Sequence, residues 1–310
     1  MRYSRPVRVI FGIIILVAFG WYMARWMTNS VMSNDVGIVT QSSSQVAVSD
    51  PDVAVTEDST STAVDNTDMT ESVPADVPEN NVVVEEEPPA PRPEELKAAE
   101  LGLPTPPEVD VYGWELMLVN AKHPIDTYEP PQLAYLSMNG EDTNISYEYS
   151  DYRCPVDSRI AQPLIDFTQG CRQAGLPVYL SSGYRSYDNQ NYLYERKIGQ
   201  GYTPEVAATI VARPGTSEHQ TGLVCDITDY YRELKDSSLE FTETYQWLKE
   251  HCAEYGFVVR YPADKSGSAD SITGIIYEPW HFRYVGVEPA TYMMENNLCL
   301  EEFLALYGVE

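Results

Sequence analysis

The chain has 310 residues and a formal net charge of −27, with 47 acidic against 20 basic side chains. A surface with this charge repels the phosphates of DNA and RNA, so the composition argues against nucleic acid as a partner. The length is enough for one large domain or two small ones, and the sequence contains no internal repeat.

Residues 1–27 are predicted to hold a membrane segment. Three arginines precede an apolar run at residues 9–24, and Trp21, Tyr22 and Trp26 can extend it into the membrane interface. Basic residues on the N-terminal side predict that this end lies inside the cell. We expect a single-pass anchor in the cell membrane with the rest of the chain extracellular. A cleavable signal peptide is the alternative, although no good small-residue cleavage site follows the run.

Residues 28–100 are predicted to be a disordered acidic linker. The stretch is rich in Ser, Thr, Val, Asp, Glu and Pro, and residues 35–100 carry sixteen acids against Arg92 and Lys97. Too few apolar residues are present to build a core, and charge repulsion and proline extend such a chain. The linker is therefore expected to hold residues 101–310, the predicted folded domain, away from the membrane.

The pattern of the remaining chain mixes helices and strands. Apolar spacing of three and four residues predicts helices, and short runs between turn residues predict strands. The expected helices are 157–174, 188–197, 204–212, 242–255 and one or two within 288–308. The expected strands are 114–120, 177–181, 223–227 and 257–261. The two types do not alternate strictly, which favours an α+β fold over a doubly wound sheet.

Two short motifs contain the residues with the most chemical information. The first is Ser217-x-His219-x-x-Gly222-x-x-x-Asp226, and the second is a Glu-x-x-His about fifty residues later. His219 is expected in a loop and Asp226 on the apolar strand that follows, where an unpaired carboxylate would be costly and a cation is the natural partner. Two imidazoles, one carboxylate ligand and one spare carboxylate are what a catalytic zinc site needs.

These motifs resemble those of the VanY-like D-alanyl-D-alanine carboxypeptidases, zinc enzymes that trim peptidoglycan stem peptides. The segment Ser-Gly-Tyr184-Arg185, with Gln190 five residues later, also matches, and the resemblance covers residues 113–286. It implies a single zinc-peptidase domain of the hedgehog/DD-peptidase type, which we expect to be a monomer acting on stem peptides. One departure is Val224, where the family usually has alanine.

The resemblance implies that zinc is held by His219, Asp226 and His281. Glu278 is the predicted general base, since a carboxylate beside a metal-activated water can take its proton and pass it to the leaving amine. Glu218 is a rival base because it adjoins His219. As the neighbour of a ligand on an extended segment, its side chain is expected to point away from the metal.

Arg185 is predicted to bind the negatively charged groups of the substrate. A carboxypeptidase substrate ends in a free carboxylate and its scissile carbonyl becomes an oxyanion, and the planar guanidinium suits either. By resemblance, Gln190 and Ser217 would help to hold the terminal residue of the peptide. Tyr184 and Trp280 are expected to line the cleft. Cleavage of D,D bonds is expected rather than L,D bonds, although the motifs do not separate the two.

Two other functions remain open from the sequence. One is a non-catalytic zinc-containing module that binds wall peptides or a partner, because hedgehog signalling domains resemble these peptidases. The other is a cysteine hydrolase that uses Cys225 and His219, although Cys225 is expected on the strand face opposite the metal. The remaining histidines, His123 and His251, are expected to be structural. Five cysteines are an odd set for an exported domain, and no pairing is predicted for them.

Overall fold

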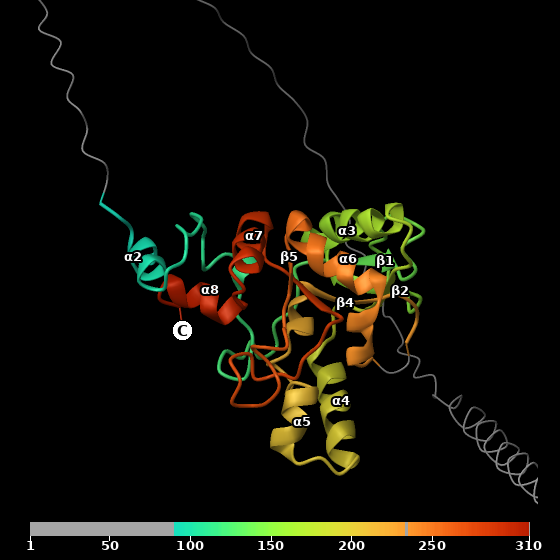
Figure 1. Cartoon of the computed structure of the whole chain (residues 1–310). Coiled ribbons are helices and arrows are strands. Elements are labelled where there is room, and N and C mark those ends of the chain that lie inside the picture. Colours follow the sequence, from blue (N-terminus) through green and yellow to red (C-terminus); the bar gives the residue numbers. More distant parts are fainter. Residues whose placement is uncertain (1–89, 233–234, 310) are drawn as a thin grey trace, which may run out of the picture. The chain divides into compact units, whose positions relative to one another are not determined.

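The computed structural model describes residues 90–232 and 235–309 (Figure 1). The predicted membrane segment at 1–27 and the predicted linker up to residue 89 lie outside this part of the chain. Within the described part, no helix combines the length and the apolar character that crossing a bilayer requires.

The described chain is an α+β fold, as predicted. Its helices are α2 (Pro93–Glu100), α3 (Ala161–Gln173), α4 (Tyr187–Gly199), α5 (Pro204–Ile210), α6 (Glu243–His251), α7 (Val287–Glu295) and α8 (Leu300–Leu306). Its strands are β1 (Leu133–Ser137), β2 (Arg153–Asp157), β3 (Tyr179–Ser182), β4 (Val224–Thr228), β5 (Phe257–Val259) and β6 (His281–Tyr284). Short 3-10 turns join several of them.

The strands form one four-stranded sheet and one two-stranded hairpin. The larger sheet has the order β3-β4-β6-β5 with antiparallel neighbours, and β1 pairs with β2. Strand β6 thus inserts between β4 and β5, which precede it in the chain. This order places the second half of the predicted motif directly beside the first half.

One face of the four-stranded sheet is apolar. Side chains alternate across a strand, so Cys225 and Ile227 of β4 and Phe282 of β6 point to the same side. There they pack against α3 and α6, which lie together over the sheet (Figure 1). The centre of this core is Phe167 of α3, which is completely buried and contacts the Phe282 ring edge-on at a centroid distance of 5.6 Å.

A second core joins the C-terminal helices. Buried side chains of α7 and α8, among them Met293 and Phe303, pack together with Val258 of β5. Helix α2 packs on α8: Ala98 is completely buried, and Lys97 Nζ donates to a backbone carbonyl of α8. The folded chain thus begins before residue 101, the predicted start of the domain, because the last turns of the predicted linker have a surface on which to pack.

The strand predicted at 114–120 is wrong. Trp114–Leu116 form a 3-10 turn, and the chain beyond it is irregular. The carbonyl oxygens of Glu115 and Met117 accept hydrogen bonds from the guanidinium of Arg283 instead of from a neighbouring strand. The apolar and aromatic residues that suggested a strand are used for packing, and the Trp114 ring stacks on Tyr284 at 5.9 Å.

Candidate active site

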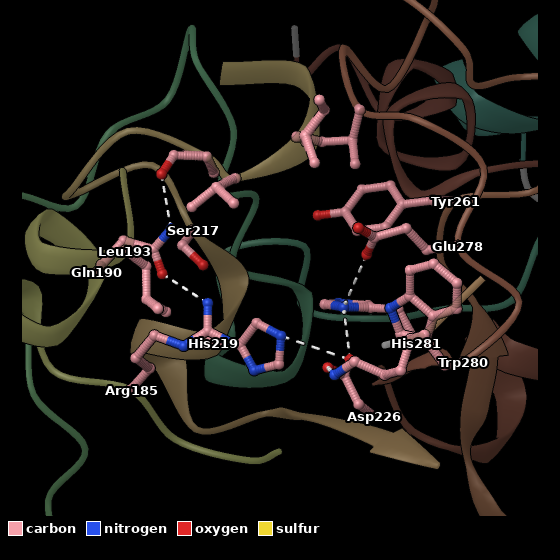
Figure 2. Close-up of a pocket in the computed structure, with 15 residues that line it drawn as sticks. Arg185, Gln190, Leu193, Ser217, His219, Asp226, Tyr261, Glu278, Trp280 and His281 are labelled. Atoms are coloured by element: carbon pink, nitrogen blue, oxygen red, sulfur yellow. Dashed lines mark hydrogen bonds and ion pairs between the residues drawn. The ribbon is translucent and has the colours of Figure 1, made fainter. Parts of the chain in front are cut away.

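Two of the predicted ligands come from adjacent strands. Asp226 of β4 and His281 of β6 are direct cross-strand partners in the antiparallel register. Both point away from the face that packs on α3 and α6, because the residues beside them, Cys225 and Phe282, occupy that face. Figure 2 shows the two side chains converging in the same cleft.

The third predicted ligand, His219, comes from the loop before β4. It lies in a 3-10 turn, Glu218–Thr221, that ends at Gly222 with φ of +71°. A side chain at Gly222 would be strained at this φ, and its Cβ would come within 2.8 Å of the backbone nitrogen of Asp157. Glycine therefore lets the turn close tightly and aim His219 at the sheet.

The three side chains fit a zinc ion. His219 Nε2 lies 3.5 Å from Asp226 Oδ1, and His281 Nδ1 lies 3.3 Å from the same oxygen. Ligands about 2.0–2.1 Å from a tetrahedral zinc are separated by about 3.3 Å, so these distances match a shared ion. All three ligand atoms lie within 4.8 Å of one another.

Two of these atoms also need a partner that the described part of the chain does not supply. Asp226 Oδ1 and His281 Nδ1 are buried polar atoms without a hydrogen bond within the described chain. Leaving such groups unsatisfied costs about 1–3 kcal/mol each, so a cation at this point explains both. The other oxygen of Asp226 is paired with the ammonium of Lys235, which leaves Oδ1 for the metal.

The outer nitrogens of both histidines are held by acceptors. His219 Nδ1 lies 2.7 Å from the carbonyl oxygen of Gly183, and His281 Nε2 lies 3.4 Å from Glu218 Oε2. An acceptor on one ring nitrogen fixes the proton there and presents the lone pair of the other nitrogen to a metal. The arrangement thus prepares His219 Nε2 and His281 Nδ1 as ligand atoms.

The electrostatics of the imidazoles differ. Burial and the positive charge of Arg185 lower the pKa of His219 to about 4. Burial also opposes a charge on His281, but the adjacent carboxylates of Asp226 and Glu218 favour the charged imidazole and raise its pKa to about 9. His219 is therefore a ready neutral ligand, whereas His281 must lose a proton when a cation binds.

Glu278 lies beside this group of ligands. Its Oε2 is 3.6 Å from His281 Nδ1, and the turn that carries it is closed by a hydrogen bond from His281 N to Glu278 O. Burial raises the pKa of Glu278 to about 7, with the negative charge of Asp226 adding to the shift. A carboxylate of this pKa can both accept and return a proton near neutral pH.

Arg185 lines the same cleft from the β3–α4 loop. Its Nη1 donates to Gln190 Oε1 at 2.8 Å and its Nη2 to Ser182 Oγ at 3.1 Å. Gln190 in turn donates to the carbonyl of Ala212 at 2.6 Å. Its amide is thus occupied by protein partners, so Gln190 orients Arg185. Ser217 lies on the wall of the cleft near them (Figure 2).

Of the two aromatic residues expected in the cleft, the structure places only Trp280 on its wall. The Tyr184 side chain does not line the cleft. Its backbone nitrogen donates to Pro155 O, while that of the next residue, Arg185, donates to His219 O. Successive side chains on this extended segment point in opposite directions, so directing Arg185 into the cleft turns Tyr184 out of it.

The cleft has a volume of about 230 Å³, and two polar residues on its wall were not predicted from the sequence. Tyr261 follows β5 and packs against His281, with ring centroids 4.7 Å apart. Lys235 reaches Asp226 from a segment without a motif. The position of Tyr261 at the end of a predicted strand was a usable signal, but nothing in the sequence marks Lys235.

The cysteine-hydrolase alternative does not fit the structure. Cys225 is completely buried in the apolar core, on the side of β4 opposite Asp226, as expected. Burial raises the pKa of its thiol well above the ordinary value, so it is not a ready nucleophile. All five cysteines are buried free thiols. His251 lies outside the cleft, stacked on Trp247 at 4.4 Å.

Comparison with known proteins agrees with the site. Residues 153–287 match the family profile of VanY, D-alanyl-D-alanine carboxypeptidase. Over 203 residues the chain is 38% identical to a D-alanyl-D-alanine carboxypeptidase of Enterococcus faecalis (strain ATCC 700802 / V583), covering 63% of this chain and 67% of the relative.

The solved structures that are similar to this one include the following two. A mutant of the vancomycin-resistance D,D-pentapeptidase VanY, in complex with Zn(II), is 36% identical with a TM-score of 0.50, over 62% of this chain and 99% of that chain. The LdcB LD-carboxypeptidase, described in terms of peptidoglycan recognition, is 30% identical with a TM-score of 0.52, over 61% and 84% of the two chains. The chain therefore belongs to the VanY family of D-alanyl-D-alanine carboxypeptidases, which are zinc peptidases.

Proposed function

We propose that this VanY-family carboxypeptidase removes the C-terminal D-alanine from peptidoglycan stem peptides by cutting a D,D bond. The observation that carries the proposal is one cleft that holds a zinc ligand set, a carboxylate with a raised pKa and an arginine. These are the parts needed to hydrolyse the last peptide bond of a chain that ends in a free carboxylate.

In the proposed mechanism, His219, Asp226 and His281 hold the zinc ion. When bound, zinc activates a water molecule and polarises the scissile carbonyl. Glu278 takes the proton of the attacking water, which its raised pKa permits near neutral pH, and then protonates the leaving amine of D-alanine.

Arg185 is the proposed anchor of the substrate. It is the arginine on the wall of the cleft, and Gln190 and Ser182 fix its guanidinium from behind. A guanidinium held in this way can bind a terminal carboxylate or the developing oxyanion. Ser217 and Trp280 would shape the pocket around the terminal residue.

A variant can separate these two roles of Arg185. In Arg185→Met the charge is lost with little change in volume, and a hydrogen bond to a charged group contributes about 1.5–3 kcal/mol. If Arg185 binds the carboxylate, kcat/KM for the free-acid peptide falls by about 10- to 150-fold, while a C-terminal amide peptide is cut equally slowly by variant and wild type. Equal losses on both peptides would assign Arg185 to the oxyanion instead.

D,D specificity is supported by the 38% identity to the D-alanyl-D-alanine carboxypeptidase of Enterococcus faecalis and the 36% identity to the D,D-pentapeptidase VanY. L,D cleavage is the second candidate because a relative with that activity has the same fold. A non-catalytic module has less support, since a binding site for zinc and peptide has no use for a buried carboxylate such as Glu278.

The test is incubation of the purified protein with a synthetic stem pentapeptide and the matching tetrapeptide, followed by mass spectrometry. The proposal expects loss of one D-alanine from the pentapeptide, and loss of that activity when a chelator removes zinc. Cleavage of the tetrapeptide alone would establish the L,D reading. Cleavage of neither by zinc-loaded protein would overturn the enzymatic proposal for stem peptides.

We also propose that residues 9–24 anchor the chain in the cell membrane and that the catalytic domain faces the wall from outside. The support is the three arginines before the apolar run and the interfacial tryptophans within and after it. Protease treatment of intact cells would digest the catalytic domain if this is so. Full protection in intact cells, with digestion after lysis, would contradict it.

A further inference from the structure

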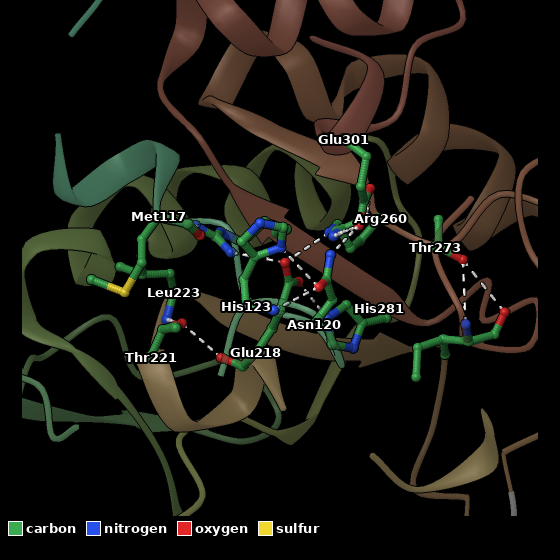
Figure 3. A network of polar contacts seen from close by, with 12 residues as sticks. Met117, Asn120, His123, Glu218, Thr221, Leu223, Arg260, Thr273, His281 and Glu301 are labelled. Atoms are coloured by element: carbon green, nitrogen blue, oxygen red, sulfur yellow. Dashed lines mark hydrogen bonds and ion pairs between the residues drawn. The ribbon is translucent and has the colours of Figure 1, made fainter. Parts of the chain in front are cut away.

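The predicted rival base, Glu218, lies in a buried network of charges behind the zinc site (Figure 3). Its side chain is completely buried and makes three contacts. Arg260 Nε and Arg283 Nη1 lie 2.7 and 2.9 Å from Oε1, and His281 Nε2 lies 3.4 Å from Oε2. The expectation that Glu218 points away from the metal holds, but it points at the back of a ligand.

The two carboxylate oxygens of Glu218 thus have separate partners. Both arginines bind Oε1, whereas Oε2 is left to the imidazole of His281. If the network served packing alone, a bidentate pair of one arginine with both oxygens would satisfy the carboxylate better. The observed division reserves one oxygen for His281.

The arginines are themselves held rigidly. Arg260 makes a bidentate contact with Glu301 of α8 at 2.9 and 2.7 Å, and Glu301 also accepts from Asn120. Arg283 donates to the carbonyls of Glu115 and Met117. Each buried guanidinium therefore has partners besides Glu218, and the carboxylate cannot rotate without breaking several charged hydrogen bonds.

We propose that Glu218 is a positioning residue for the zinc site: its Oε2 accepts the Nε2–H of His281 and thereby presents His281 Nδ1 to the metal. Arg260 and Arg283 keep the Glu218 carboxylate in place. A carboxylate in this position, behind a metal-binding histidine, fixes the tautomer and the orientation of the imidazole. The inference rests on the zinc site and not on which peptide bond the enzyme cuts.

The first test compares zinc affinity in two variants of the network. In Glu218→Gln the amide group facing His281 can donate to Nε2, which would move the imidazole proton to Nδ1 and block the ligand atom. We expect zinc affinity, measured on the apoprotein by competition with a chromogenic chelator, to fall by about 10- to 100-fold. Glu301→Gln removes a charge from the same network without touching His281 and is the matched control.

The expected result is weak zinc binding in Glu218→Gln and near-normal zinc binding in Glu301→Gln. Wild-type affinity in Glu218→Gln would overturn the proposal. Equal losses in both variants would also overturn it, because the network would then act on the site only through general stability. Neither readout depends on peptide hydrolysis, so failure here is distinct from failure of the proposed function.

The second test needs no variant and holds even if Glu218→Gln does not fold. In the zinc-loaded full-length protein with 15N-labelled histidine, long-range 1H–15N spectra identify which ring nitrogen carries the proton. The proposal expects the His281 proton on Nε2, in a hydrogen bond that slows its exchange with water. A proton on Nδ1, or an Nε2 proton in free exchange with solvent, would contradict the role of Glu218.

Discussion

The two faces of the four-stranded sheet are built from the same strands but serve opposite purposes. On one face Cys225 and Phe282 pack against Phe167 of α3 in a core of apolar side chains. On the other face their immediate neighbours, Asp226 and His281, form a buried site with charges. A one-residue alternation along a strand is therefore enough to place a candidate metal site directly behind an apolar core.

The two faces differ in how well they tolerate substitutions. The apolar face gains its stability from burial and close packing, which are distributed over many contacts. The polar face depends on a few atoms whose positions must agree within a fraction of an ångström. Changes on the first face should therefore affect stability, and changes on the second should affect zinc and chemistry.

The largest effect is expected from removing the Asp226 carboxylate, which lies close to both histidine ligands. Asp226→Ala deletes the oxygen that lies 3.5 and 3.3 Å from His219 and His281 and leaves Lys235 without its partner. We expect the purified variant to contain almost no zinc and to lack hydrolysis, as measured by metal analysis and a peptide assay. Stoichiometric zinc in this variant would remove Asp226 from the ligand set.

The next effect separates chemistry from metal binding. Glu278→Gln keeps the shape of the side chain but cannot accept a proton, and a positioned general base contributes about 10²- to 10⁴-fold to the rate. We expect kcat to fall by that amount while zinc content stays near one per chain. If the variant lost its zinc as well, Glu278 would be part of the metal site and its assignment as base alone would be wrong.

The dependence on pH should be smaller and should come from the same residue. Because Glu278 acts as a base only when ionised, kcat/KM should fall about tenfold per pH unit below its apparent pKa. Burial raises that pKa to about 7, and the charge of a bound zinc favours the carboxylate, so the acid limb should lie at or below pH 7. In Glu278→Gln this limb should disappear from the residual activity. Its persistence would assign the limb to another group.

The smallest effect on chemistry is expected from the apolar face. Phe167→Ala removes the ring that contacts Phe282 and Phe257, and truncation of a buried Phe costs about 3–5 kcal/mol of unfolding free energy. We expect a lower urea midpoint but a nearly unchanged kcat per zinc-loaded molecule at low temperature. A loss of kcat comparable to that of Glu278→Gln would show that the two faces are not independent.

Much of this site could be predicted because its residues belong to short sequence motifs. The spacing from His219 through Gly222 to Asp226 indicates a loop that turns into a strand, and the structure shows that turn and strand. The Glu-x-x-His pair predicts two side chains on one turn, and Glu278 and His281 lie 3.6 Å apart. Predictions from such motifs are correct because they depend on backbone geometry over a few residues and not on distant parts of the chain.

Where the prediction failed, distant partners were responsible. The segment at 114–120 has the composition of a strand but begins with a 3-10 turn. Two of its backbone carbonyls accept hydrogen bonds from the guanidinium of Arg283 instead of from a neighbouring strand. Tyr184 was expected in the cleft together with Arg185, yet only one of two neighbours on an extended segment can face it. In both places the deciding group lies elsewhere in the chain.

The class of chemistry follows from the sequence: it contains the residue types of a zinc ligand set, a base and an anionic-substrate anchor, in an α+β domain with an acidic N-terminal extension. The folded chain is needed to see which oxygen of Asp226 is left for a metal, which nitrogen of His281 faces it, and that Glu218 lies behind that ring. The physical reason is that ligand type follows from side-chain chemistry alone. Orientation follows from hydrogen bonds to Lys235, Arg260 and Arg283, whose positions the fold sets.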